Sequence, residues 1–299
     1  MANIAFIGLG AMGRPMARRL IEQQHRVMGF DLNKAALAEL ASLGGHAASS
    51  AREACADADL LVLMVVNADQ AEAVLFGADA LSALKPDAAV ILMATCPPAR
   101  VAAMAARVLA SGRHFIDAPV SGGVVGAEAG TLTVMAAAPQ AVFNKARDVL
   151  ATMGSRLFHV GETAGQGATV KTVNQLLCGV HIAVAAEAFA LAEKAGVDTS
   201  LMLDILTQSA AGSWMLANRG PRMLEDEPAV TSAVDIFVKD LGIVMDAGRA
   251  AHTALPLAAA AHQMFLAASG AGHGKADDSQ VIRAYRALNG TTSTPPSSS

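Results

Sequence analysis

Residues 4–20 read IAFIGLGAMGRPMARRL, and this stretch carries the strongest signal for the fold. A short apolar run ends at a glycine, two further glycines follow at the spacing GxGxxG, and a run typical of a helix begins at the third. The first glycine of such a turn allows the tight bend, the second lets the backbone approach a pyrophosphate, and the third lets the helix pack against the strand. The positive end of the helix attracts phosphate. The stretch therefore predicts a dinucleotide-binding turn formed by Gly8, Gly10, Ala11, Met12 and Gly13.

An acidic residue at the end of the next apolar run supports this interpretation. Asp31 closes the run RVMGFD. A carboxylate at this position accepts hydrogen bonds from the ribose hydroxyls and repels a 2′-phosphate, which favours NAD over NADP. Two alternatives stay open: Lys34 could contact a 2′-phosphate, and Asp31 could be an ordinary turn residue at a strand end.

The order of apolar runs predicts two domains. Up to residue 162, short β-rich runs alternate with Ala-rich helical runs, which predicts a parallel sheet covered by helices on both faces. From residue 163 onward the pattern is helical, and its first helix, from about Thr169 to Ala195, is long. We expect an α/β Rossmann-type NAD-binding domain (1–162) followed by an all-α domain for substrate binding and oligomerisation (163–289). A disordered tail (290–299) would complete the chain.

The composition narrows the class of protein. The 299 residues are 53% hydrophobic with a formal net charge of −4, so nothing attracts nucleic acid or an anionic membrane. Neither the three cysteines nor the histidines show metal-ligand spacing, and we predict no metal. The start of the chain lacks the features of a signal peptide, and the uninterrupted apolar runs are shorter than a membrane span, so we expect a cytoplasmic protein.

A single lysine in the first long helix suggests the chemistry. Lys171 is the only formal charge between Glu162 and Glu187, and apolar surroundings favour the neutral amine. Hydride transfer from an alcohol also requires a proton carrier, which such a lysine can be. Asn174 lies three residues later on the same helix face and could hold the lysine or the substrate oxygen. The alternative is a lysine that extends to solvent from a buried helix.

Four segments of the chain resemble one family. These are IAFIGLGAMGRPMA (4–17), DAPVSGGVVGAEAGTLTVM (117–135), GQGATVKTVNQ (165–175) and FVKDLGIVMDAG (237–248). In this order they are similar to the β-hydroxyacid dehydrogenases, relatives of the 6-phosphogluconate and 3-hydroxyisobutyrate dehydrogenases. The resemblance implies an NAD-dependent oxidation of a small hydroxyacid that carries a carboxylate.

The resemblance also implies roles for individual residues. Lys171 would be the general acid/base and Asn174 its partner, facing a cleft between the two domains. Ser121, Gly122 and Gly123 would hold the substrate carboxylate. On the cofactor side, Thr95, Phe237 and Lys239 would lie near the nicotinamide. The chain departs from many relatives before Thr95, because Leu92 and Ala94 stand where aspartate and serine are common.

The helical half most resembles the branch that oxidises L-threonate to 2-dehydro-L-erythronate. Within that branch Trp214, Asn218 and Arg219 would receive the far end of the substrate, since a polyol needs hydrogen-bond partners. Other substrates stay open: 3-hydroxyisobutyrate, or tartronate semialdehyde in the reductive direction. Imine reductases share the architecture but usually lack the lysine. A catalytically silent NAD-binding sensor is a more remote alternative. The resemblance further implies a homodimer or homotetramer.

Overall fold

The computed structural model describes residues 1–290. The tail was expected over residues 290–299, and all of it after Gly290 lies outside the described residues. The chain divides into two compact units, the first spanning Met1–Lys171 and the second beginning at Thr172. The division falls inside one continuous helix, α9 (Gln166–Lys194). The boundary predicted after residue 162 precedes the first turn of this helix.

A mixed β-sheet forms the centre of the first unit. Its strand order is β3-β2-β1-β4-β5-β6-β8-β7, with β9 paired to β8. The six strands from β3 to β6 in this order run parallel to one another, as the alternation of strands and helices predicts. The strands are β1 (Asn3–Ile7), β2 (Arg26–Phe30), β3 (His46–Ala47), β4 (Leu60–Leu63), β5 (Ala89–Leu92), β6 (His114–Asp117), β7 (Val120–Ser121), β8 (Thr133–Ala137) and β9 (Arg156–Gly161).

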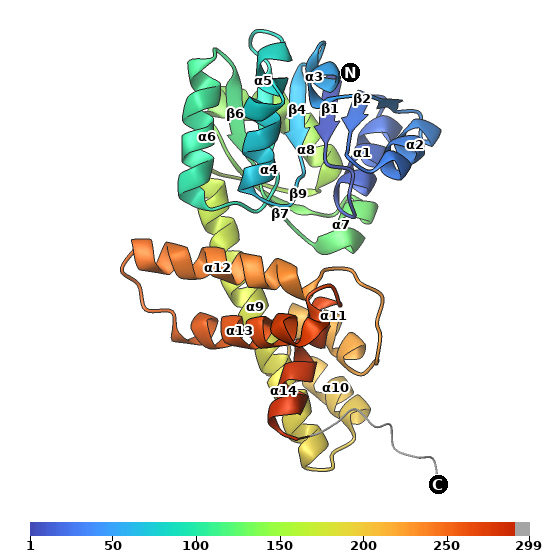
Figure 1. The fold of residues 1–299 in the computed structure, drawn as a ribbon, viewed down its shortest axis with the longest axis vertical. Coiled ribbons are helices and arrows are strands. Elements are labelled where there is room, and N and C mark those ends of the chain that lie inside the picture. Colours follow the sequence, from blue (N-terminus) through green and yellow to red (C-terminus); the bar gives the residue numbers. More distant parts are fainter. Residues whose placement is uncertain (291–299) are drawn as a thin grey trace. The chain divides into compact units, whose positions relative to one another are not determined.

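Helices cover both faces of this sheet because its strands are apolar on both sides. Ile4 and Phe6 of β1 belong to one buried cluster, whereas Ala5 and Ile7 belong to the other. In Figure 1, α4, α5 and α6 lie in front of the strands and α8 lies behind them. The helices of this unit are α1 (Gly13–Glu22), α2 (Lys34–Ser42), α3 (Ala51–Cys55), α4 (Ala68–Glu72), the π-helix η1 (Ala73–Gly77), α5 (Ala80–Ala83), α6 (Pro98–Ala110), α7 (Gly123–Ala129) and α8 (Gln140–Met153).

The far end of the sheet departs from the all-parallel prediction. β8 runs antiparallel to β6 and β7, with Asp117 opposite Ala137 and Val120 opposite Val134. A parallel return would need a crossover across a face of the sheet, and the chain between β6 and β8 makes none. The crossover helix α8 then brings β9 back parallel to β8. Because the chain reverses direction here, Ser121 lies in β7, the last strand of this order, and Gly122 and Gly123 follow it.

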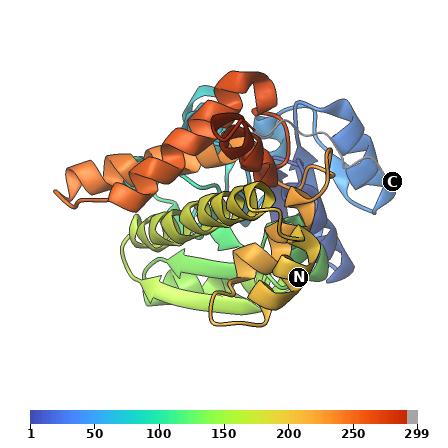
Figure 2. The ribbon, with the colours of Figure 1, turned by 90° about the horizontal axis from the view of Figure 1, so that it is seen from below.

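The second unit is helical in its described part, in agreement with the sequence. Its core contains large buried side chains from α9, α12 and α13, among them Phe189, Leu241 and Phe265. Both views show α12 and α13 lying side by side (Figures 1 and 2). After α9 the elements are α10 (Thr199–Thr207), α11 (Trp214–Met223), α12 (Val234–Ala250), α13 (Pro256–Ala268), the π-helix η2 (Ser269–His273), the 3-10 helix η3 (Asp278–Val281) and α14 (Ile282–Leu288).

Helix α9 is long and apolar enough to span a membrane, although the uninterrupted apolar runs of the sequence are all shorter than a membrane span. By length and composition it could cross a membrane, with a mean hydropathy of 1.7 over its most apolar window. Half of that window is buried inside the protein, and Ile182 and Phe189 of this helix are fully enclosed in the core. Such burial is typical of the core helix of a globular protein.

Candidate active site

The three glycines of the first turn have three different surroundings. Gly8 has a φ of +96°, and a Cβ there would lie 2.3 Å from the carbonyl oxygen of Met64. At Gly13 a Cβ would lie 1.8 Å from the carbonyl oxygen of Gly8, so the start of α1 packs directly on the turn. A Cβ at Gly10 would meet nothing within 4 Å. The space at Gly10 is therefore open for a group outside the protein backbone, which fits a pyrophosphate approaching this turn.

Asp31 lies directly after β2 and is fixed by the backbone. Its Oδ2 accepts the N–H of Leu9 at 2.6 Å, and its Oδ1 accepts the N–H of Asn33 at 2.7 Å. The side chain is only partly buried. Because each carboxylate oxygen has two lone pairs, each keeps one for a further donor such as a ribose hydroxyl. The residues present thus fit the adenosine half of a dinucleotide.

Four further predicted residues of the first unit lie at or just after the ends of strands. Ser121 ends β7, and Gly122 and Gly123 follow with φ of +129° and +63°. Gly123 is exposed, and a Cβ there would meet nothing within 4 Å, so the space beside this turn is open, as an anion-binding nest requires. Thr95 lies half-buried between β5 and α6.

Lys171 is 7% exposed and lies at the start of α9. Asp117, the last residue of β6, fixes this end of the helix: its Oδ2 accepts the N–H of Gly165 at 2.8 Å and that of Ala168 at 2.9 Å. Gly167 allows the close approach, since a Cβ there would lie 2.5 Å from the carbonyl oxygen of Met135. Burial raises the pKa of Asp117 to about 6, although three backbone N–H donors lower it. Lys171 follows one turn after this anchor.

Asn174 takes part in a chain of hydrogen bonds within the second unit. Its Nδ2 donates to Gln175 Oε1 at 2.9 Å and to Cys178 Sγ at 3.4 Å. Gln175 Nε2 donates to Asp240 Oδ2 at 2.5 Å, and Lys239 Nζ donates to Asp240 Oδ1 at 2.6 Å. Lys239 and Asn174, both predicted from the sequence, are thus connected through the buried side chains of Asp240 and Gln175.

Phe237 has a packing role in the structure. It is 3% exposed and stacks on Phe265, with ring centroids 5.2 Å apart. Its predicted position beside the nicotinamide stays a prediction.

The three residues predicted for the far end of the substrate lie on α11, and they differ in their availability. Trp214 is 60% exposed, whereas Arg219 is 8% exposed. Arg219 donates from Nε and NH2 to the two oxygens of Asp278, at 3.0 and 2.8 Å, and from NH1 to Asn218 Oδ1 at 2.7 Å. These bonds occupy the guanidinium of Arg219 and the amide oxygen of Asn218, so their role in substrate binding also stays a prediction.

A second ion pair extends this buried network. Arg222 NH1 donates to Asp277 Oδ2 at 2.7 Å. Burial raises the pKa of Asp277, but the hydrogen bond from Thr231, those from Ser279 and the charge of Arg222 outweigh it, and the pKa falls below its usual range. Burial also raises the pKa of Asp278. For this carboxylate the effect of burial is larger than the opposite effect of Arg219, so the pKa lies above its usual range. The network joins α11 to η3.

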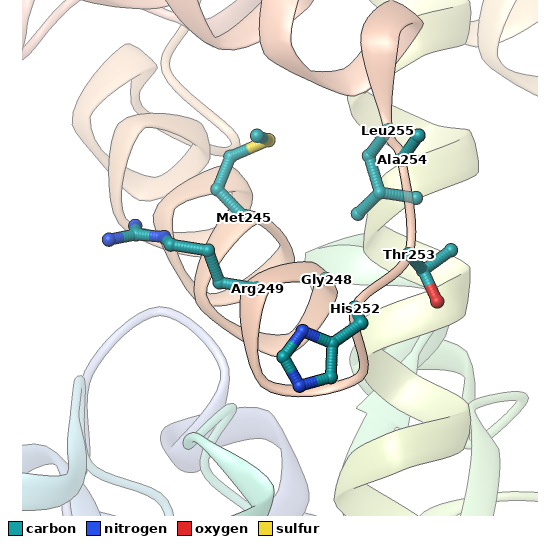
Figure 3. Close-up of a pocket in the computed structure, with 7 residues that line it drawn as sticks. All are labelled: Met245, Gly248, Arg249, His252, Thr253, Ala254 and Leu255. Carbon is teal, nitrogen blue, oxygen red and sulfur yellow. The ribbon is translucent and has the colours of Figure 1, made fainter.

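A hollow of about 390 Å³ lies at the end of α12. Figure 3 shows the residues that line it, on the last turns of α12 and on the loop toward α13. The lining residues are Met245, Gly248, Arg249, His252, Thr253, Ala254 and Leu255. None of the site residues predicted from the sequence is among them. Within residues 1–290 no group of three or more His, Cys, Asp or Glu side chains is arranged to hold a metal ion.

Comparison with known proteins agrees with this geometry. The family model for the NAD-binding domain of 6-phosphogluconate dehydrogenase matches residues 3–161, and the model described as NAD-binding of NADP-dependent 3-hydroxyisobutyrate dehydrogenase matches residues 165–285. Both describe nicotinamide-dependent dehydrogenases, the class to which the glycine turn and Asp31 also point. The chain belongs to the β-hydroxyacid dehydrogenase family, and it is an NAD-binding oxidoreductase of that family.

Similar proteins cover nearly the whole chain. An L-threonate dehydrogenase of Cupriavidus necator is 46% identical over 95% of this chain and 96% of its own. A 2-(hydroxymethyl)glutarate dehydrogenase of Eubacterium barkeri is 38% identical over 97% of both. The crystal structure of a 3-hydroxyisobutyrate dehydrogenase from Salmonella typhimurium has a TM-score of 0.89 and 44% identity, over 94% of this chain and 98% of its own.

Asp117 and Gln175 have roles in the structure that the sequence pattern did not predict. Asp117 ends the strand HFID, and a carboxylate at the end of a buried strand is a signal for a nearby donor. Gln175 is a long polar side chain next to Asn174, at the point where the helix becomes apolar. Neither signal identifies the partner, because Gly165 lies 48 residues from Asp117 and Asp240 lies 65 residues from Gln175.

Proposed function

We propose that this protein oxidises L-threonate to 2-dehydro-L-erythronate with NAD, and that Lys171 carries the proton. The observation that carries the proposal is the buried lysine at the start of α9, held one turn after the Asp117 anchor. The 46% identity to an L-threonate dehydrogenase supports the choice of substrate.

In this mechanism the substrate carboxylate binds at Ser121, Gly122 and Gly123, where the serine hydroxyl and the backbone N–H groups of the glycines would be the donors. The neutral amine of Lys171 accepts the proton of the substrate hydroxyl, and the C–H bond on the same carbon releases a hydride. NAD, when bound, supplies the hydride acceptor. Asn174 fixes the geometry, and Lys171 afterwards returns the proton to water. The carbon–oxygen single bond becomes a carbonyl, so that one proton and one hydride leave the alcohol.

For the cofactor, Gly8 to Gly13 would hold the pyrophosphate and Asp31 the ribose, while Thr95 and Lys239 would lie toward the nicotinamide. Asp31 favours NAD. NADP belongs in every assay, since one matching family model is described for an NADP-dependent enzyme.

The test follows the absorbance of reduced nicotinamide with L-threonate, D-threonate, 3-hydroxyisobutyrate and glycerate, each with NAD and with NADP. We expect turnover of L-threonate with NAD, and a loss of roughly 10²- to 10⁴-fold in kcat in Lys171→Met. NADH binding, measured by fluorescence, is the control and should be unchanged in the variant. Turnover that survives Lys171→Met would contradict the mechanism.

The second candidate substrate is 3-hydroxyisobutyrate. It is favoured by the Salmonella structure, which is described as a 3-hydroxyisobutyrate dehydrogenase and is 44% identical to this chain. Turnover of this compound in preference to L-threonate would retain Lys171 as the proton carrier and replace the proposed substrate.

We further propose that the protein is a cytoplasmic homodimer or homotetramer in which α9 contributes to the interface. Val173, Leu177, Val184 and Leu191 are between 50% and 69% exposed and share one face of this helix. An apolar stripe of this length is typical of a surface covered by another chain. Light scattering that finds a monomer would contradict this proposal.

A further inference from the structure

Five side chains on α9 and α12 form one continuous series of hydrogen bonds, which we call the amide chain: Lys239, Asp240, Gln175, Asn174 and Cys178. Its middle is buried, with Gln175 6% and Asp240 2% exposed. The two helices lie close here because Gly179 has no Cβ, which would come 2.7 Å from Leu241. A mismatched pair inside such a chain would leave a buried polar group unsatisfied.

The direction of every bond in the chain follows from Asp240. One carboxylate oxygen accepts from the ammonium of Lys239, which can only donate, and the other faces Gln175. Because a carboxylate can only accept, Gln175 must present its Nε2 to Asp240. Its Oε1 then faces Asn174, which must present its own Nδ2. The amide of Asn174 is therefore held in one of its two orientations, with Nδ2 toward the chain and Oδ1 on the other side.

This orientation matters for the proposed function, on which the inference rests. The two donors of Asn174 are used by Gln175 and Cys178, so the group that Asn174 has to offer is an acceptor. An acceptor suits the N–H of the protonated Lys171 or the hydroxyl of the substrate, whereas a flipped amide would offer donors to them. We propose that Asp240, acting through Gln175, is a positioning residue that sets the amide orientation of Asn174.

Replacing Asp240 by asparagine reverses the chain with almost no change of shape. In Asp240→Asn the amide oxygen stays with Lys239, which can only donate, so the new Nδ2 faces Gln175. Gln175 then turns its Oε1 toward residue 240 and its Nε2 toward Asn174, and Asn174 must flip.

The double variant Gln175→Glu/Asp240→Asn restores the original direction. The glutamate accepts from the new amide on one side and from Asn174 Nδ2 on the other, so Asn174 returns to its first orientation. The matched control is Cys178→Ala, which removes one acceptor of Asn174 but leaves the direction set by Gln175.

Steady-state kinetics on the hydroxyacid substrate test the proposal. We expect Asp240→Asn to lower kcat roughly ten- to a hundredfold, the effect of losing a hydrogen bond to a charged group, with the NADH affinity unchanged. The double variant should recover most of this loss, and Cys178→Ala should stay within about twofold of the wild type. A double variant no better than Asp240→Asn would overturn the proposal. So would a loss confined to the cofactor affinity, which would assign Asp240 to Lys239 alone.

A second readout separates this proposal from the proposed function. The side-chain amide signals of Asn174, assigned in an NMR spectrum by their disappearance in Asn174→Asp, should exchange slowly with solvent in the wild type. They should exchange faster in Asp240→Asn and slowly again in the double variant. A wild type that turns over no hydroxyacid but shows this pattern would overturn the proposed function and support the amide orientation. Exchange that is unaffected by Asp240→Asn would overturn the orientation itself.

Discussion

Asp31 and Arg219 are both charged side chains that the sequence predicts to bind a ligand. In the structure they differ in burial and in how many of their hydrogen-bonding groups are already bonded. Asp31 accepts two backbone N–H groups, remains partly exposed and keeps lone pairs for another donor. Arg219 is buried and directs three of its nitrogens at Asp278 and Asn218. A charged side chain held in place by hydrogen bonds can therefore still have groups available for a ligand, or it can have all of them bonded within the protein. What distinguishes the two cases is the bonding capacity that remains.

The largest expected effect is on the structural side of this comparison. Arg219→Ala should lower the free energy of unfolding by about 3–5 kcal/mol, since it leaves the fully buried carboxylate of Asp278 without its partner. Urea denaturation measures this. The matched control is Arg249→Ala, whose ion pair with Asp246 is exposed and should contribute less than about 1 kcal/mol.

Equal stability of the two arginine variants would contradict a structural role for Arg219. If Arg219→Ala instead raised the KM for substrate with no loss of stability, Arg219 would belong with Asp31 as a ligand-binding residue.

Asp117 is an intermediate case, a carboxylate that accepts backbone N–H groups like Asp31 but is buried like Asp278. Burial raises its pKa from 3.8 to about 6, so between these values the folded protein binds more protons than the unfolded chain. Its contribution to the free energy of unfolding therefore falls as the pH rises through this window, by up to ~3 kcal/mol.

Asp117→Asn cannot titrate and provides the reference. The stability of the wild type relative to this variant should decrease between pH 4.5 and pH 7.5, as measured by thermal unfolding at both values. A relative stability that increases with pH would mean that the backbone donors prevail over burial, and that Asp117 resembles Asp31.

The smallest effect is expected on the ligand side. Asp31→Ala should weaken NADH binding roughly ten- to a hundredfold, because the ribose hydroxyls lose their acceptor. NADPH binding should change less, since the repulsion of its 2′-phosphate is removed as well. The two cofactors, titrated by fluorescence on the same variant, control for each other. Equal losses would show that Asp31 serves the turn through Leu9 and Asn33 rather than the ribose.

Local pattern was sufficient for much of the fold. The glycine turn, five of the six parallel strands and the helical second half follow from periodicity and turn residues, because these reflect contacts between near neighbours in the chain. The antiparallel β8 could not be predicted in this way, since the direction of a strand depends on the path of the connection before it. The two-residue strand β3 is too short to carry a periodic signal.

The sequence by itself determined that this chain has a dinucleotide turn, an acidic residue placed for a ribose, and one lysine in an apolar helix with an asparagine three residues later. Only the tertiary structure decided which polar groups are already used. It joined Asp117 to the start of α9, Gln175 to Asp240, and Arg219 to Asp278. The physical reason is that a hydrogen bond depends on distance and direction in space, whereas the sequence records only the order of the groups that can form one.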